Sequence, residues 1–199
     1  MIYHSSPFGR MTKVVVEIFL AAYTTRYHAL RLEPCVEYIL ILHNSGPRAG
    51  ASVPHPHSQI FAIPIIPPDV FRSLTGSANY YKKNRRCVHC DMLKWEIGKK
   101  ERIIFQNELF VALAPYASKV AYEVRIFPKK HEASFEVIDQ EQKTALAQTM
   151  HEVFSKIYKN LKNPDYNFFI HTAPPKEADI GHYHWHMEIL PKFNIIGSF

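Results

Sequence analysis

An internal repeat is the feature that most limits how this chain can fold. The segment Cys35–Asn44 resembles the segment Pro164–Thr172, and each follows a stretch with the apolar spacing of an amphipathic helix. Each then continues through a polar loop that contains proline into a His-x-His segment, His55-Pro56-His57 in the first copy and His184-Trp185-His186 in the second. Because element order and histidine placement agree, the sequence predicts two copies of one α+β unit.

The two copies differ in how much of the unit they contain. The pattern predicts helices over 11–31 and after Asp139, a short helix within 69–100, and strands over 37–43, 55–66, 101–106, 109–115, 121–128, 166–172 and 183–190. The second copy, 69–199, thus holds a complete unit, whereas the first, 1–68, holds only the C-terminal half of a preceding unit. We expect an antiparallel sheet with helices, and a chain that begins inside a domain, as a fragment or a truncated gene, with an exposed sheet edge.

Composition and charge narrow the class of protein. Apolar residues make up 47% and charged residues 21%, as in soluble globular proteins. No apolar run reaches the ~18 residues of a membrane span and no signal peptide is visible, so we expect a cytoplasmic protein that does not enter a membrane. The net charge of +6 suits a phosphate-bearing partner, but only 82–86 is a basic cluster, which disfavours a nucleic acid.

The cysteines favour a metal site over a disulfide framework. There are three, an odd number, in a chain with no visible secretion signal. Cys87 and Cys90 form a Cys-x-x-Cys pair, which is typical of zinc sites once two further ligands complete the tetrahedron. The alternative is a pair of reduced thiols near a basic surface. Cys35 precedes an apolar strand, so we expect it in the core.

The first His-x-His segment carries the parts of a phosphoryl-transfer or nucleotidyl-transfer site. Residues two apart in a strand share a face, so His55, His57 and Gln59 are expected to project together. Imidazole is a good nucleophile near neutral pH, and a glutamine amide can donate to a phosphate oxygen in the transition state. Gly46 and Gly50 in the preceding loop let backbone N–H groups approach phosphate oxygens. The alternative is a pair of ordinary strand histidines.

The segment from Asn44 to Gln59 strongly resembles the active-site segment of the galactose-1-phosphate uridylyltransferases and the related ADP-glucose phosphorylases. These two-domain enzymes belong to the histidine-triad superfamily. The resemblance continues through 87–90, 128–131, 171–174 and 184–186, so it covers nearly the whole chain. It implies a histidine-triad-like α+β fold and, because the family forms dimers, a homodimer.

The resemblance also implies roles for individual residues. His57 would attack the α-phosphorus of a nucleotide sugar and release a sugar 1-phosphate, and a second sugar 1-phosphate would then take the nucleotidyl group. Gln59 and Ser52 match positions that contact the phosphates, and Asn44 matches a contact on the nucleotide side. The substrate-binding residues expected on this basis are Asn44, Gly50, Ala51, Ser52 and Gln59.

The resemblance implies zinc as well. Its second-unit site would be structural, with four protein ligands: Cys87, Cys90, His131 and His184. The repeat favours His184 over His182 or His186, because His184 corresponds to His55, which resembles the ligand of a first metal site. The family's other ligands to that first site are missing from this sequence, so His55 alone does not complete it.

Three hypotheses therefore stay open at this point. The first is a nucleotidyltransferase that uses UDP-glucose and galactose 1-phosphate through a covalent nucleotidyl-histidine. The second is an ADP-glucose phosphorylase that transfers an adenylyl group. The third is a non-catalytic, zinc-stabilised module. The sequence does not decide between a uridine and an adenine nucleotide.

Overall fold

The computed structural model describes residues 7–177 and 180–193, and within them seven strands form one antiparallel sheet in the order β2-β1-β6-β7-β5-β4-β3. The strands are β1 (Tyr38–Ser45), β2 (Ser58–Ile63), β3 (Ile103–Gln106), β4 (Phe110–Leu113), β5 (Val124–Pro128), β6 (Asp165–His171) and β7 (His186–Lys192). The α-helices are α1 (Lys13–Leu30), α2 (Pro68–Asn84), α3 (Val88–Lys99) and α4 (Gln140–Asn160). Short 3-10 helices cover Phe8–Arg10, Pro47–Ala49, Phe135–Val137 and Pro175–Glu177. The predicted α+β class with an antiparallel sheet is confirmed.

The two copies of the repeat meet where β1 pairs with β6. In that pairing Ile41 lies opposite Ile170, and Leu42 lies opposite Phe169. In the repeat, Ile41 corresponds to Phe169 and Leu42 corresponds to Ile170, so each residue pairs with the counterpart of its neighbour. A local two-fold axis generates this reciprocal pattern. The first copy therefore extends the sheet of the second instead of forming a sheet of its own.

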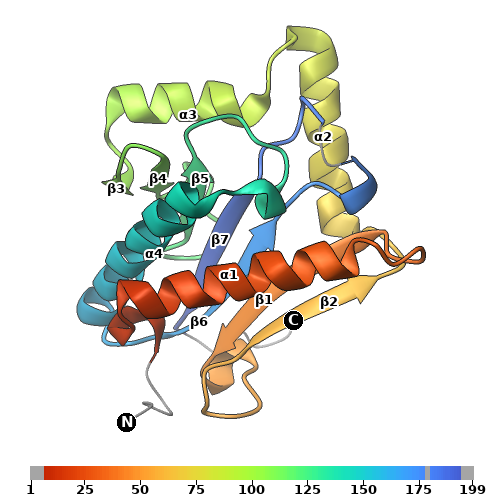
Figure 1. Ribbon diagram of the computed structural model, residues 1–199. Coiled ribbons are helices and arrows are strands. Elements are labelled where there is room, and N and C mark those ends of the chain that lie inside the picture. Colours follow the sequence, from red (N-terminus) through yellow and green to blue (C-terminus); the bar gives the residue numbers. More distant parts are fainter. Residues whose placement is uncertain (1–6, 178–179, 194–199) are drawn as a thin grey trace, which may run out of the picture.

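One face of the sheet is covered by α1 and α4, which lie together in front of it in Figure 1. The main apolar core lies between these two helices and the sheet. It includes the buried residues Leu20, Tyr27, Ile41, Leu146, Phe154, Phe168, Trp185 and Met187. Burying one such side chain contributes roughly 1.5–3 kcal/mol. The helix α4 begins at the predicted cap, because the Asp139 carboxylate accepts from the Gln142 N–H, and the Gln142 amide oxygen accepts from the Asp139 N–H.

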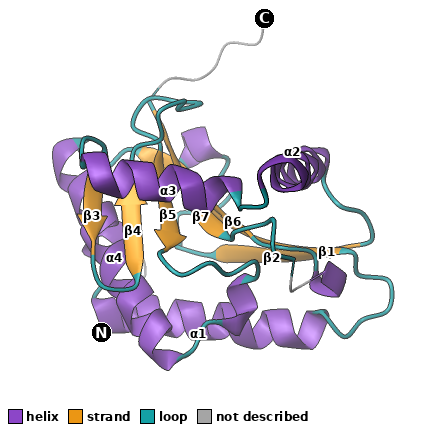
Figure 2. Ribbon diagram, turned by 90° about the horizontal axis from the view of Figure 1, so that it is seen from above, coloured by secondary structure: helices purple, strands orange, loops and turns teal. Residues whose placement is uncertain are grey.

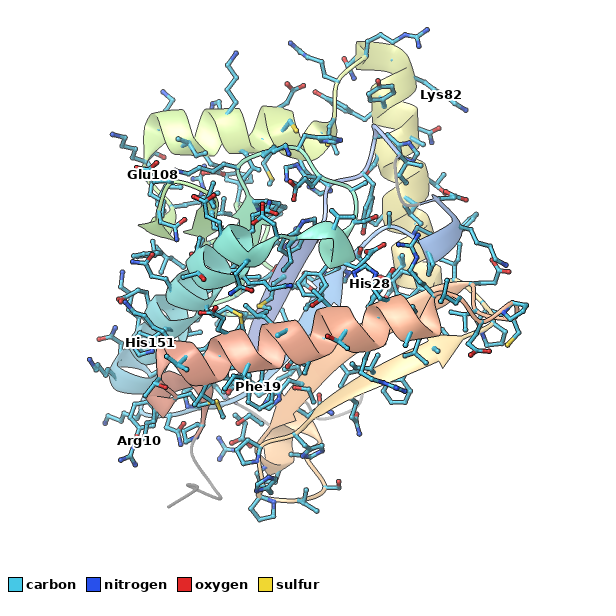
Figure 3. All side chains as sticks on the ribbon, viewed as in Figure 1. Arg10, Phe19, His28, Lys82, Glu108 and His151 are labelled. Atoms are coloured by element: carbon cyan, nitrogen blue, oxygen red, sulfur yellow. The ribbon has the colours of Figure 1, made fainter. Side chains whose placement is uncertain are left out.

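The other face of the sheet carries α2 and α3, as Figure 2 shows. Leu74 of α2 belongs to a small core with Tyr38, and Leu93 of α3 packs with Phe127. Lys82 lies near the far end of α2, at the top of Figure 3, whereas the β1–β2 loop lies at the bottom of that view. The basic cluster at 82–86 is therefore remote from this loop.

Several predicted elements differ in detail from the structure. The stretch 69–100 holds two helices instead of one short one, because one helix begins at Pro68 and a second follows the N-cap residue Cys87. The strand β2 begins at Ser58, since Pro54 and Pro56 have no N–H for a sheet ladder. Cys35 is exposed, not in the core. No helix in the described ranges is both long and apolar enough to span a bilayer.

Two glycines shape the β1–β2 loop. Gly46 has φ 84° and ψ 161°, a region that is essentially restricted to glycine, and Gly50 has φ 80° and ψ 21°, in the left-handed region. A Cβ at Gly46 would also overlap the Asp165 carboxylate on β6, whereas a Cβ at Gly50 would meet nothing within 4 Å. Gly46 is thus required both by its backbone conformation and by the closeness of β6.

We predict that Gly46→Ala destabilises the protein much more than Gly50→Ala. Both variants place alanine at a positive φ, which costs about 1–2 kcal/mol in the left-handed region. Gly46→Ala adds the clash with Asp165 and a backbone region in which strain costs up to roughly 3 kcal/mol. Urea unfolding of the two variants would give the difference in the free energy of unfolding, and equal losses would contradict this account of the loop.

Candidate active site and metal centre

The β1–β2 loop encloses a cavity of about 430 Å³ beside the end of β1. Of the expected substrate-binding residues, Asn44, Ala51 and Ser52 line it, and so does His55. The other lining residues are Pro7, His43, Ser45, Gly46, Pro47, Val53, Pro54, Pro56 and Asn163. The structure therefore brings together a polar loop and a cavity large enough to receive part of a nucleotide.

His57 follows the last lining residue of the loop, Pro56, and is half-buried. Its Nδ1 lies 2.9 Å from the carbonyl oxygen of His55. A carbonyl oxygen only accepts hydrogen bonds, so Nδ1 carries a proton, and in the neutral ring the lone pair is on Nε2. The expectation that His55 and His57 share a strand face was wrong, because both precede β2. Instead, the backbone of His55 fixes the tautomer that a nucleophile requires.

Gln59 and the loop amides are placed differently from the expected phosphate contacts. Gln59 is an exposed residue of β2 and does not line the cavity. The N–H of Gly50 donates to the Pro47 carbonyl at 3.1 Å, and the N–H of Ala51 donates to the Gly46 carbonyl at 3.1 Å. Both groups are thus used within the loop in this structure.

Sequence reasoning missed a group of three hydrogen-bonded residues, which adjoins His57 through the next residue in the chain, Ser58. The Ser58 hydroxyl contacts the Tyr23 hydroxyl at 2.5 Å and the Nδ1 of His43 at 3.0 Å. Burial, with a smaller contribution from the charge of His57, lowers the pKa of His43 to about 4, so this histidine is neutral at pH 7. The hint in the sequence was the serine next to the candidate nucleophile, but its partners come from α1 and β1.

The predicted metal ligands form one compact group. The ligand atoms of Cys87, Cys90, His131 and His184 all lie within 4.8 Å of one another. The Nε2 of His184 lies 3.0 Å from the Pro128 carbonyl, so Nε2 holds the proton and Nδ1 faces Cys90 at 3.5 Å. Burial lowers the pKa of His184 to about 3, which keeps its ring neutral, as metal coordination requires.

The cysteine pair also fits a bound cation. Burial, together with the adjacent Cys87, raises the pKa of Cys90 to about 12. A nearby cation would reverse this shift by stabilising the thiolate. Cys87 is the N-cap of α3 and Cys90 lies in its first turn, while His131 follows β5 and His184 precedes β7, so residues from three separate parts of the chain meet at this group. Among residues 7–177 and 180–193, this is the one group of three or more cysteine, histidine or acidic side chains that could hold a metal ion. The exposed residue His55 is not part of it.

In the second copy of the His-x-His segment, the last histidine makes the same contact with a backbone carbonyl, but its side chain is buried. The Nδ1 of His186 lies 3.1 Å from the carbonyl oxygen of His184, as His57 relates to His55. His186, however, is buried, and its ring stacks between the rings of Phe127 and His171, each at 4.9 Å. The same local geometry is therefore closed to a substrate in the second copy.

Glu188 replaces Gln59 in the second copy and is held by cations. Its carboxylate pairs with Arg125 at 3.0 Å, Lys119 at 3.0 Å and His171 at 3.4 Å. Burial alone would raise its pKa, but the hydrogen bond and charge of His171 and those of Lys119 outweigh burial and lower the pKa to about 2. A carboxylate at this place opposes the binding of a phosphate.

Comparison with known proteins matches both parts of the chain to one family. A sequence model described as the N-terminal domain of galactose-1-phosphate uridyl transferase matches residues 1–67, and that of the C-terminal domain matches residues 74–195. The chain is 32% identical to an ADP-glucose phosphorylase of Arabidopsis thaliana over 98% of this chain and 55% of that relative. It is 31% identical to a galactose-1-phosphate uridylyltransferase of Thermotoga maritima over 94% of this chain and 59% of that relative.

A solved structure agrees with these relationships. An ADP-glucose phosphorylase from Arabidopsis thaliana with bound ADP-glucose superimposes with a TM-score of 0.89 at 31% identity, covering 98% of this chain and 62% of that chain. This chain thus spans little more than half the length of its curated relatives. With both domain models matched and the histidine site in place, the chain belongs to the galactose-1-phosphate uridylyltransferase family.

Proposed function

We propose that the protein carrying this chain is a nucleotidyltransferase, which moves uridylyl groups between UDP-glucose and galactose 1-phosphate. The observation that carries the proposal is the contact between His57 Nδ1 and the His55 carbonyl, which in the neutral ring leaves the lone pair on Nε2, in the residue that directly follows the lining of the loop cavity. Several relatives named galactose-1-phosphate uridylyltransferase support it. The proposal concerns the whole protein, because the chain spans only part of the length of those relatives.

The reaction would proceed in two displacements at one phosphorus. The Nε2 lone pair of His57 attacks the α-phosphorus of UDP-glucose, and the bond from that phosphorus to the β-phosphate oxygen breaks, which releases glucose 1-phosphate. A phosphate oxygen of galactose 1-phosphate then attacks the same phosphorus, the P–N bond breaks, and neutral His57 is restored. Nδ1 would keep its proton throughout, because that N–H donates a hydrogen bond to the His55 carbonyl.

The surrounding residues would bind and orient the phosphates. Asn44, Ala51 and Ser52 would contact the nucleotide from the cavity wall. Gly50 would give the loop its turn, and Gln59 would donate its amide to a non-bridging oxygen from the exposed side of β2. His55 is proposed as the ligand of a further metal site whose other ligands lie outside the described residues.

The second candidate is an adenylyl-transferring phosphorylase that acts on ADP-glucose. The observation in its favour is the likeness to the Arabidopsis ADP-glucose phosphorylase, at 32% sequence identity, and to a solved structure of such an enzyme, at a TM-score of 0.89. Both reactions would use the same histidine chemistry, and they differ in the nucleotide and in the acceptor, which for a phosphorylase is inorganic phosphate. A non-catalytic module remains the third hypothesis, and it is the one that predicts no covalent labelling.

We further propose zinc as the metal at Cys87, Cys90, His131 and His184, because two thiolates and two imidazoles in a compact group suit a tetrahedral zinc ion. Four protein ligands would leave no open position, so its role would be structural, in a unit spanning 69–199 that follows a partial unit at 1–68. A homodimer and a cytoplasmic location stay predictions.

We predict that His57 becomes covalently nucleotidylated. The protein is incubated with UDP-glucose or ADP-glucose labelled at the α-phosphorus and quenched in alkali, in which a P–N bond survives. His57→Ala should abolish the label, whereas the control His28→Ala, on the exposed side of α1, should keep it. The nucleotide that labels faster identifies the reaction.

Two results would overturn the role of His57. One is label retained by His57→Ala, and the other is label found on a different residue of the intact protein. Absence of labelling with both nucleotide sugars would favour the non-catalytic hypothesis.

We also predict one zinc ion per chain that stabilises the fold. Cys87→Ser should lose the metal, and at free zinc about 1,000-fold above its Kd this removes about 4 kcal/mol of stability. For a chain of this size that corresponds to a fall in Tm of roughly 8–16 °C. Cys35→Ser is the matched control, because Cys35 is exposed and outside the ligand group.

Zinc content and thermal unfolding are measured on the same preparations. Cys35→Ser should keep both values of the parent protein. An unchanged zinc content in Cys87→Ser would remove the assignment of these ligands.

A further inference from the structure

Side chains of the second unit hold the substrate loop of the first. Asn167 on β6 lies directly opposite Asn44 on β1 in the sheet register. Its Nδ2 donates to the Asn44 Oδ1 at 2.7 Å and to the Ala49 carbonyl oxygen at 2.7 Å. Two positions earlier on β6, the Asp165 carboxylate accepts from the Arg48 N–H at 2.6 Å and packs against Gly46. The loop is thus fixed from β6 at several points.

These contacts decide which way each amide is turned. The Ala49 carbonyl can only accept, so Asn167 must point its NH2 group toward it. The two protons of that NH2 group are then used by Ala49 and by Asn44, and Asn44 must accept through its oxygen. The end of the Asn44 amide that Asn167 does not use is therefore its own NH2 group. Because the Ala49 carbonyl can only accept, it fixes the orientation of the Asn167 amide, and the Asn167 amide in turn fixes the orientation of the Asn44 amide.

We propose that Asn167 is a positioning residue that turns the NH2 group of Asn44 into the loop cavity, where it donates to an oxygen of the bound nucleotide sugar. Asn44 lines that cavity, which makes it the point of contact. The proposal rests on the proposed function for the identity of the ligand. It adds that the ligand group in contact with Asn44 is a hydrogen-bond acceptor, such as a phosphate, hydroxyl or carbonyl oxygen. Asn167, a residue of the second unit, would set this preference by orienting the Asn44 amide.

Because Asn167 donates and Asn44 accepts, replacing each asparagine by aspartate should affect the stability of the protein to different extents. Asn44→Asp keeps an acceptor facing Asn167, so the bond between the two residues persists. Asn167→Asp removes the donor and sets a carboxylate against the Ala49 carbonyl, which can only accept. Both variants add one negative charge close to Asp165, so this electrostatic cost is shared and does not explain a difference.

The experiment compares Asn44→Asp, Asn44→Ala and Asn167→Asp in the full chain. Thermal unfolding should leave Asn44→Asp within about 2 °C of the parent Tm and lower that of Asn167→Asp by roughly 4–8 °C. Calorimetric titration with UDP-glucose and with ADP-glucose should show at least about a tenfold weaker Kd for all three variants, since each loses the donor or its orientation. Asn44→Asp should be weaker than Asn44→Ala, because it also brings an anion toward the phosphates.

The outcomes separate this proposal from the proposed function. Equal losses of Tm in Asn44→Asp and Asn167→Asp would overturn the assigned orientation, and an unchanged Kd in Asn44→Asp would overturn the donor role. If the parent protein binds neither nucleotide sugar, the proposed function and the ligand contact both fail, while the Tm comparison still decides the orientation. A double variant, Asn44→Ala with Asn167→Ala, should bind no more weakly than Asn44→Ala alone, and additive losses would contradict action through Asn44.

Discussion

The pairing of β1 with β6 is the interaction on which the rest of the structure depends. It joins the two copies of the repeat into a single sheet and sets the register in which Asn44 faces Asn167 and Gly46 approaches Asp165. Since the side-chain period of a strand is two, a slip of one residue would turn every side chain of β1 to the opposite face. His43 would leave its place against Phe168 in the core, and the loop would lose its support from β6. The active loop is thus a product of both units, although its sequence lies wholly in the first.

Burial distinguishes two histidines that share the same local geometry. His57 and His186 each hold a proton on Nδ1 through the carbonyl two residues earlier. His186 is enclosed by aromatic rings, and next to it Glu188 is neutralised by Arg125 and Lys119. The second unit instead uses the first histidine of its segment, His184, beside the cysteine pair. The same local geometry thus leaves a histidine half-buried in the first copy and fully enclosed in the second.

The parts of the structure that could be predicted are those encoded within short stretches of sequence. The Asp139 cap and the succession of strands along the chain depend on local spacing, and they were confirmed. The metal group was found from the Cys-x-x-Cys pair and the family resemblance, and the four side chains do meet. The start of β2 was misjudged because periodicity was weighed without the missing N–H groups of Pro54 and Pro56. His43, Asn167 and Tyr23 could not be recognised, because their roles arise from strand register and helix packing between distant segments.

The close approach of Gly46 to Asp165 has a consequence for how this protein can evolve. The two positions are far apart in the sequence, yet a carboxylate at one fills the space that a side chain at the other would need. A side chain at 46 would need a smaller residue at 165, another acceptor for the Arg48 N–H and a different backbone conformation in the loop. Substitutions in the loop are therefore linked to substitutions on β6, and the two copies of the repeat cannot diverge independently where they touch.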